Sequence, residues 1–290
     1  MHTCPSCLDH YEDDTWTCPA CGAEPSRISG YPTFTAGAES QQPAEFDETT
    51  YQTMTSFEAR SFYIKSRFDL MYWAFRNFFP EARSFLDFGG GTGYWLEALA
   101  DRQPEAALFG TDLSIDSLHV MKRRLGERAT VFHTDAESIP FEDHFDVIGS
   151  FDVIEHIDDD VGVLKTLKRP LKKGGGLMVT VPQHPCLWST LDTKTGHKRR
   201  YAGNELARKV SEAGYDVVLD TGFMASLFVP QYISRRFLSQ AEESTPDLEH
   251  SLPAPINGLF RAVLAVELAA IRAGLRFSFG GLRIVCARSR

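Results

Sequence analysis

The clearest chemical signal in this chain is the stretch Phe85-Leu86-Asp87-Phe88-Gly89-Gly90-Gly91-Thr92-Gly93. A short apolar run ends in an acid, glycines follow, and a helix-like segment begins at Tyr94. Glycines allow a sharp backbone turn and let a ligand approach the main chain closely. The free amide groups at the start of a helix favour a carboxylate or a phosphate. The stretch therefore predicts a strand, a ligand-binding turn and a helix.

The glycine spacing decides which ligand is expected. The dinucleotide fingerprint needs the order G-x-G-x-x-G, and here the sixth position counted from Gly89 is Tyr94. The order D-x-G-x-G-x-G instead resembles motif I of class I S-adenosylmethionine-dependent methyltransferases. That resemblance implies that the turn holds the methionine part of the cofactor, with contacts from Asp87, Gly89, Gly91 and Gly93. An ordinary strand-to-helix turn is the alternative interpretation.

Two further acids follow predicted strands, at the edge of the sheet where such a cofactor would lie. Asp112 ends the second strand, where a carboxylate can accept hydrogen bonds from both ribose hydroxyls; a helix N-cap is the alternative. For Asp135 the resemblance implies a hydrogen bond with the adenine amine, and for Ala136 an amide contact with a ring nitrogen; a plain loop acid is the alternative. The same resemblance implies further cofactor contacts from Leu113 and Phe151.

A second cluster of polar residues has the types needed to act on a methyl acceptor. Asp152, Glu155 and His156 fall within about one turn of chain and can point into one pocket, and His197 follows in a later polar stretch. In one interpretation His156 is a general base, with an ordinary pKa of about 6.5; Glu155 and His197 are the other candidate catalytic residues. In a second, the four residues ligate a divalent metal, as the similarity to metal-using 2′-O-methyltransferases of small RNAs and to ubiquinone-pathway O-methyltransferases implies. In a third, Glu155 and His156 only shape the pocket.

The acceptor is predicted to be a small molecule, such as a natural-product, sugar or lipid precursor, and oxygen is the expected methylated atom. The basic run Lys198-Arg199-Arg200 can bind an anionic group of the acceptor. Alternatively, it is a solvated loop. An RNA methyltransferase that binds its substrate through the N-terminal segment is one alternative. A non-catalytic cofactor-binding scaffold is the other.

Four N-terminal cysteines form two C-P-x-C pairs: Cys4 with Cys7, and Cys18 with Cys21. Four thiolates in two close pairs match tetrahedral zinc, and a short, acidic, coreless segment needs a metal to fold. A redox pair is the alternative, but the strand–helix context of such motifs is missing. The sequence predicts a structural zinc ribbon over residues 1–24 and a linker over residues 25–50.

The elements that must position these groups alternate along the chain. The predicted strands are 85–88, 107–110, 129–132, 145–150 and 177–182, and the predicted helices are 56–79, 94–102, 114–125, 158–169 and 203–213. This alternation favours a doubly wound α/β fold with ligands at the carboxyl ends of the strands. With 215–219 and 281–287 as the last two strands, the resemblance implies a mostly parallel, seven-stranded sheet of the Rossmann-like methyltransferase fold over residues 51–290.

A helical insertion at about 222–279 separates the last two predicted strands, and it is too long for a simple connection. It contains an apolar run, 223–233, and a predicted helix, 255–277, interrupted by arginines. The insertion can cover the active site as a lid, lie on a membrane surface through its helix, or form core packing or a dimer interface.

Composition narrows the class of protein. The formal net charge is −9, most of it lies in the first 50 residues, and there is no broad basic face of the kind that nucleic-acid binding needs. The N-terminus lacks the charged and apolar regions of a signal peptide, so we expect a cytoplasmic protein with reduced cysteines. The oligomeric state does not follow from the sequence.

Overall fold

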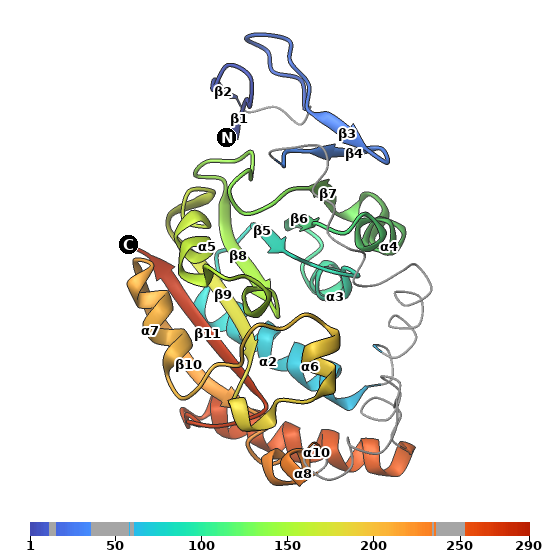
Figure 1. The fold of residues 1–290 in the computed structure, drawn as a ribbon, viewed down its shortest axis with the longest axis vertical. Helices are drawn as coiled ribbons and strands as arrows, with labels where there is room; N and C mark the ends of the chain where they lie inside the picture. The colour runs from blue at the N-terminus through green and yellow to red at the C-terminus, as the bar shows by residue number, and fades with distance from the viewer. Residues whose placement is uncertain (12–15, 36–57, 59–60, 234, 236–252) are drawn as a thin grey trace.

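A single mixed sheet organises the chain in the computed structural model, which describes residues 1–11, 16–35, 58, 61–233, 235 and 253–290. Nine strands follow the order β10-β11-β9-β8-β5-β6-β7-β4-β3 (Figure 1). The central strands are β5 (Ser84–Phe88), β6 (Ala107–Asp112), β7 (Thr130–His133), β8 (Phe145–Phe151), β9 (Leu171–Pro182), β10 (Tyr215–Phe223) and β11 (Leu282–Ser289). Pairing is parallel from β7 to β9, and β11 is antiparallel to both β9 and β10.

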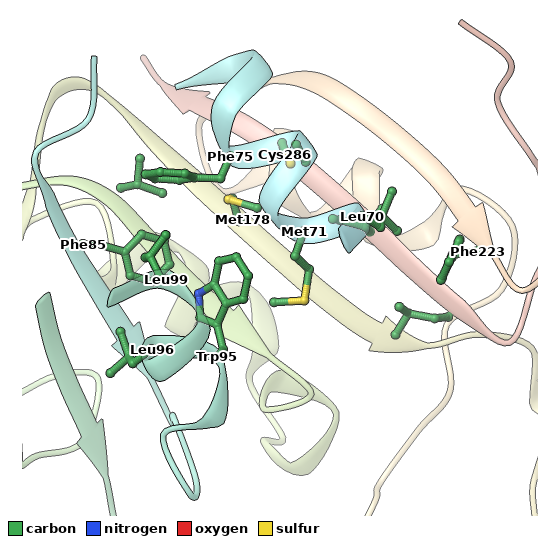
Figure 2. Packing of buried hydrophobic residues seen from close by; sticks show 14 of the residues in the cluster. Leu70, Met71, Phe75, Phe85, Trp95, Leu96, Leu99, Met178, Phe223 and Cys286 are labelled. Carbon is green, nitrogen blue, oxygen red and sulfur yellow. The ribbon is translucent and has the colours of Figure 1, made fainter. Parts of the chain in front are cut away.

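Neighbouring residues on each central strand point to opposite faces of the sheet, and both faces are covered. One face packs on α2 (Phe62–Phe78), α3 (Tyr94–Arg102), α4 (Ile115–Leu125) and α10 (Ala254–Arg272). The other packs on α5 (Asp160–Thr166) and α7 (Glu205–Glu212). On the first face, α2 and α3 meet the sheet through Met71, Phe75, Trp95 and Leu99, as Figure 2 shows. Burial on both faces explains why the strands are continuous apolar runs.

Helix α2 begins one residue after Ser61, whose side chain accepts a hydrogen bond from the Ile64 amide. It ends at Phe78, just before Pro80, as expected because proline cannot continue a helix. The first residues of the predicted helix, 56, 57, 59 and 60, lie outside the described residues.

Strand β9 begins earlier than the sequence predicts, because the glycine turn expected at residues 173–176 is part of the strand. Gly176 pairs with Val147 of β8. A Cβ atom at Gly176 would lie 2.3 Å from the ring of Phe79, so the glycine makes room for that aromatic side chain. The run of glycines thus reflects close packing as well as a turn.

The predicted linker over residues 25–50 is wrong for its first part. Strands β3 (Ser26–Ile28) and β4 (Tyr31–Thr33) form a hairpin, and β4 adds to the sheet beside β7. The Phe34 amide donates to the His133 carbonyl at 3.0 Å. An edge strand offers unpaired backbone groups to such a hairpin. The sequence analysis missed the two short strands because the segment is rich in turn-forming residues. The sheet therefore has nine strands and not seven; residues 36–50 lie outside the described residues.

The remaining elements are a small N-terminal hairpin and the helices that lie outside the core of the sheet. The N-terminal hairpin of β1 (His2–Thr3) and β2 (His10–Tyr11) carries the first cysteine pair. At the opposite end in Figure 1, α8 (Phe228–Ile233) and α10 come from the segment between β10 and β11, and α6 (Thr190–Lys194) lies in the loop after β9. The central sheet separates the cysteines from the inserted helices.

Candidate active site

The turn between β5 and α3 needs its alternating glycines. Gly89, Gly91 and Gly93 have φ values of +70°, +54° and +73°, a left-handed region that side chains disfavour. A Cβ atom at Gly89 would lie 2.6 Å from Val153, whereas at Gly91 nothing lies within 4 Å. The Gly91 backbone therefore borders open space that a ligand can occupy.

Asp112, at the end of β6, lies against this turn. Its carboxylate accepts hydrogen bonds from the Gly91 amide at 2.9 Å and from the Ser114 amide at 2.8 Å. Helix α4 is capped by the Ser114 side chain, so Asp112 is not its N-cap. The carboxylate instead connects the ends of two neighbouring strands beside the open space.

Asp87 is buried in the same place. Its exposed fraction is 2%, and Oδ1 has no hydrogen-bond partner within the described part of the chain. Burial, together with the negative charge of Asp112, raises the pKa of Asp87 to about 8. A buried carboxyl group without a full set of partners is costly, and a cationic ligand group beside it would relieve that cost.

The other residues predicted to contact the cofactor lie at the same edge of the sheet. Asp135 follows β7 and accepts a hydrogen bond from the Ser138 amide at 2.8 Å. Ala136 is buried next to it. Phe151 ends β8 and packs edge-on against Trp95 at 5.6 Å. The Leu113 carbonyl accepts a hydrogen bond from Nε2 of His133 at 3.2 Å.

A cavity of about 340 Å³ lies between the carboxyl ends of β8 and β9 and the inserted helices. Its lining includes Glu155 and His197 but not His156. Apolar side chains line much of the rest: Phe62, Pro182, Leu191, Met224, Leu227, Pro230, Phe260 and Leu282. A mostly apolar cavity with a few convergent polar groups is typical of a small-molecule site.

Glu155 is the most unusual polar group in this cavity. Its side chain is fully buried, and neither carboxyl oxygen has a hydrogen-bond partner among the residues described. Burial, reinforced by the charge of Asp152, raises the pKa of Glu155 well above its ordinary value. Nε2 of His197 lies 4.0 Å from Glu155 Oε1. The carboxyl group is thus available to a ligand in the cavity.

His197 is oriented by a carboxylate that sequence reasoning did not assign a role. Asp192 Oδ1 lies 2.8 Å from Nδ1 of His197 and 2.7 Å from Nε of Arg200. Although burial opposes it, the hydrogen bond with His197 and the charge of Arg200 hold the pKa of Asp192 below its usual range. The ionised carboxylate accepts from Nδ1–H, which leaves Nε2 of His197 as the ring nitrogen that can accept a proton.

Glu155, His156 and His197 each offer a ligand atom, and these atoms lie within 4.8 Å of one another. Nδ1 of His156 is also buried without a partner within the described ranges. The three residues therefore fit a divalent cation in type and placement. Asp152, the fourth predicted ligand, instead forms an ion pair with Arg67 and accepts a hydrogen bond from Thr180 at 3.1 Å.

The predicted basic run is divided by the structure. Lys198 pairs with Asp158 at the surface, and Arg199 pairs with Asp160 at 3.0 Å. Only Arg200 of the three lines the cavity. Arg235, which follows α8, also lines it and lies 3.4 Å from Asp192; no motif in the sequence marked this arginine.

The four N-terminal cysteines converge at one point. Their sulfur atoms lie within 4.8 Å of one another, with Cys4–Cys21 and Cys7–Cys18 separations of 3.7 Å. Zn–S bonds of about 2.3 Å in a tetrahedron require sulfur atoms about 3.8 Å apart. The spacing of these thiols therefore fits one zinc ion.

Comparisons with known proteins agree with this fold. The strand order and the glycine turn define a Rossmann-like methyltransferase fold, and residues 72–220 match the family described as "Methyltransferase domain". This match covers about half of the chain, and the chain belongs to that family. The predicted methyltransferase fold and its mostly parallel sheet are confirmed.

Among curated proteins, the chain is 30% identical over 103 residues to a malonyl-[acyl-carrier protein] O-methyltransferase of Priestia megaterium, covering 35% of this chain and 38% of that protein. It is 33% identical over 102 residues to a trans-aconitate 2-methyltransferase of Rhodopseudomonas palustris, covering 35% and 40%. The matched part thus spans about two fifths of the length of these relatives.

Among solved structures, phosphoethanolamine N-methyltransferase 2 of Haemonchus contortus in complex with S-adenosyl-L-methionine has a TM-score of 0.57 at 18% identity. The similarity covers 85% of this chain and 58% of that one. At this level of identity the likeness shows the fold.

Proposed function

We propose that this protein transfers the methyl group of S-adenosylmethionine to a small-molecule acceptor. The observation that carries the proposal is the position of the 340 Å³ cavity, which meets the end of β8 at Asp152 and Glu155, next to the glycine turn after β5. The cofactor would lie along the carboxyl edge of the sheet, with Asp112 at its ribose and Asp135 and Ala136 at its base. An acceptor in the cavity would then lie next to the methyl group.

We expect oxygen as the accepting atom, with His197 as the general base. Nε2 of His197 takes the proton from the acceptor hydroxyl, the oxygen forms a bond to the methyl carbon, and the sulfonium sulfur leaves with the electrons of the broken C–S bond. Glu155 holds the acceptor by a hydrogen bond, and Arg200 suits an acceptor with a carboxylate or phosphate group. His156 packs perpendicular to His197 at 4.8 Å and supports its orientation.

A divalent metal at Glu155, His156 and His197 is the competing mechanism, because these residues fit one. A bound cation would polarise the acceptor hydroxyl and lower its pKa. Treatment with a chelator followed by buffer exchange separates the two mechanisms: the general-base mechanism predicts unchanged activity, and the metal mechanism predicts loss that added cation restores. Elemental analysis of the same samples reports whether the chelator also removes metal from the cysteine cluster.

The cysteine cluster is proposed to hold a structural zinc ion through Cys4, Cys7, Cys18 and Cys21. Elemental analysis should find about one zinc per chain, and the Cys18→Ser, Cys21→Ser double variant should lack it. Metal retained in that variant would refute the site.

Incubation of the protein with a metabolite extract and isotope-labelled cofactor tests the activity. Mass spectrometry should detect a metabolite that gains one labelled methyl group. Asp112→Ala should lower the amount of product at limiting cofactor by weakening cofactor binding, whereas His197→Ala should abolish the product with the cofactor still bound. A protein that binds the cofactor but labels no metabolite, and whose role survives His156→Ala, Glu155→Ala and His197→Ala, would instead be a scaffold.

A further inference from the structure

The face of α10 turned away from the protein body carries almost no polar side chains. The buried face packs through Leu264, Glu267, Leu268 and Ile271. The exposed positions on the other side are Leu259, Ala262, Ala265, Val266 and Ala269, and the exposed Ala273 follows the helix. Leu259 is 61% exposed and Val266 is 71% exposed. A surface helix normally turns polar residues to water, so this face is typical of a helix with a further apolar partner.

This apolar surface extends beyond α10. Eight of the twelve exposed large hydrophobic side chains in the described ranges lie between residues 229 and 279: Val229, Tyr232, Ile233, Ile256, Leu259, Val266, Leu275 and Phe279. Glu267 accepts hydrogen bonds from the Ala225 and Ser226 amides, which holds α10 against the segment leading into α8. We call α8, α10 and residues 275–279 the apolar end; Figure 1 shows α8 and α10 at one extremity of the molecule.

The exposed charged side chains of α10 are both arginines: Arg261 and Arg272 lie beside the apolar face, and Arg276 follows the helix. Arg261 also lies 3.6 Å from Asp69 of α2. The acid of this helix, Glu267, is buried and engaged in hydrogen bonds. An apolar face bordered by arginines is the composition of a helix that lies in the plane of an anionic membrane surface.

We propose that the apolar end docks on an anionic membrane, with α10 lying along the interface. By length and composition α10 could cross a bilayer, with a mean hydropathy of 1.5 over an 18-residue window of which 22% is buried. Crossing would require Glu267 and its apolar neighbours to leave the protein core, and burying that carboxylate in lipid is costly. Lying on the surface keeps these contacts and covers the exposed face.

The cavity lies directly behind the apolar end, since Leu227, Pro230 and Phe260 line it. An acceptor with a lipid tail would reach the cavity without leaving the membrane. That consequence depends on the proposed methyl transfer, whereas the docking itself does not.

Co-sedimentation of the full-length protein with vesicles tests the docking. The protein should sediment with vesicles of equal parts phosphatidylglycerol and phosphatidylcholine, and less with phosphatidylcholine alone or in high salt, which screens the arginines. Leu259→Glu with Val266→Glu should weaken partitioning at least ~10-fold, because two apolar side chains are lost from the lipid contact. Both positions are exposed, so the melting temperature should not change. Leu8→Glu, at an equally exposed leucine of the N-terminal hairpin, is the matched control and should bind like the wild type.

The exposed apolar face of α10 could instead be covered by a second copy of the chain in a dimer. Sedimentation velocity without vesicles distinguishes the two. A monomer that binds anionic vesicles supports the proposal. A dimer that ignores vesicles and dissociates in the Leu259→Glu, Val266→Glu variant overturns it, as does a monomer that stays in the supernatant with every vesicle composition.

Discussion

Asp112 connects the glycine turn to the start of α4, because its two oxygens accept the Gly91 and Ser114 amides. In the proposed complex the same carboxylate faces the ribose. We therefore expect Asp112→Ala to weaken cofactor affinity by about 1.5–3 kcal/mol, the value of hydrogen bonds to a charged group, or about 10- to 150-fold. Isothermal titration calorimetry with His156→Ala as the comparison, expected within about threefold of wild type, checks this; equal losses in the two variants would contradict the assignment.

The structure gives Asp192 a role that the sequence did not indicate. Its carboxylate holds Nδ1 of His197, a residue that lines the cavity, so Asp192→Asn should disturb the orientation and basicity of the imidazole. We expect kcat to fall by about 10²-fold or more, with little change in cofactor affinity. Asp158→Asn removes an exposed carboxylate that pairs with Lys198 and should leave kcat near that of wild type. Steady-state kinetics on both variants, with an identified acceptor, measures this. An unchanged kcat in Asp192→Asn would show that the Asp192–His197 pair does not act in catalysis.

At the scale of elements, the N-terminal hairpin meets the sheet through an aromatic contact. The ring of His144 packs 4.6 Å from Phe141 and 6.1 Å from His2. Burial lowers the pKa of His144 to about 4, from an ordinary 6.5. Between these pH values the unfolded chain binds a proton that the folded protein excludes, so this residue lowers the free energy of unfolding as the pH falls from about 6.5 toward 4.

The expected outcome is a smaller loss of stability on acidification in His144→Gln than in the wild type. Urea unfolding at pH 7 and pH 5, with zinc content checked at each pH, measures it. Burial also lowers the pKa of His156 and His184, so part of the pH dependence should remain in the variant. His10→Gln changes an exposed histidine of the same hairpin and is the control. Identical pH dependence in His144→Gln and the wild type would show that the contact does not titrate as described.

The elements themselves were predictable where the sequence pattern is local. Helices α3 and α4 lie within a residue of the predicted ranges, because apolar periodicity and a clear cap or glycine define them. The β3–β4 hairpin was not predicted, since each strand has three residues and their stability comes from pairing with β7. Short strands of this kind depend on a partner far away in the sequence.

At the scale of the whole molecule, two separate sets of contacts organise the N-terminal segment. The cysteine cluster joins parts of the segment to one another, and the aromatic contacts join the segment to the sheet. Trp16 packs against Phe34 at 5.1 Å and against Phe132 at 5.6 Å, and β4 pairs with β7. Metal removal should therefore loosen the residues around Cys4 and Cys18 while leaving β4 in the sheet.

Hydrogen-exchange mass spectrometry on the Cys18→Ser, Cys21→Ser variant tests this separation. Amides in residues 4–11 and 16–24 should exchange faster than in the wild type, and the Phe34 amide, bonded to His133, should keep its protection. Cys186→Ser changes an exposed cysteine outside the cluster and should leave both regions unchanged. Loss of protection at Phe34 in the double variant would mean that the metal also holds the hairpin on the sheet.

The sequence alone was enough for the glycine turn, the alternation of strands and helices, the acid that ends β6, the acid that follows β7, and the paired cysteines. Each of these is a pattern among near neighbours, and near neighbours obey the geometry of a single turn, strand or helix. The cavity, the Asp192–His197 pair beside Glu155, the position of Arg235 and the apolar end were decided only by the tertiary structure. Asp192 and His197 are near neighbours in the chain, but Glu155, Arg235 and the residues of the apolar end come from elements separated by tens of positions, and all of them meet only because the sheet and the insertion pack in one particular arrangement.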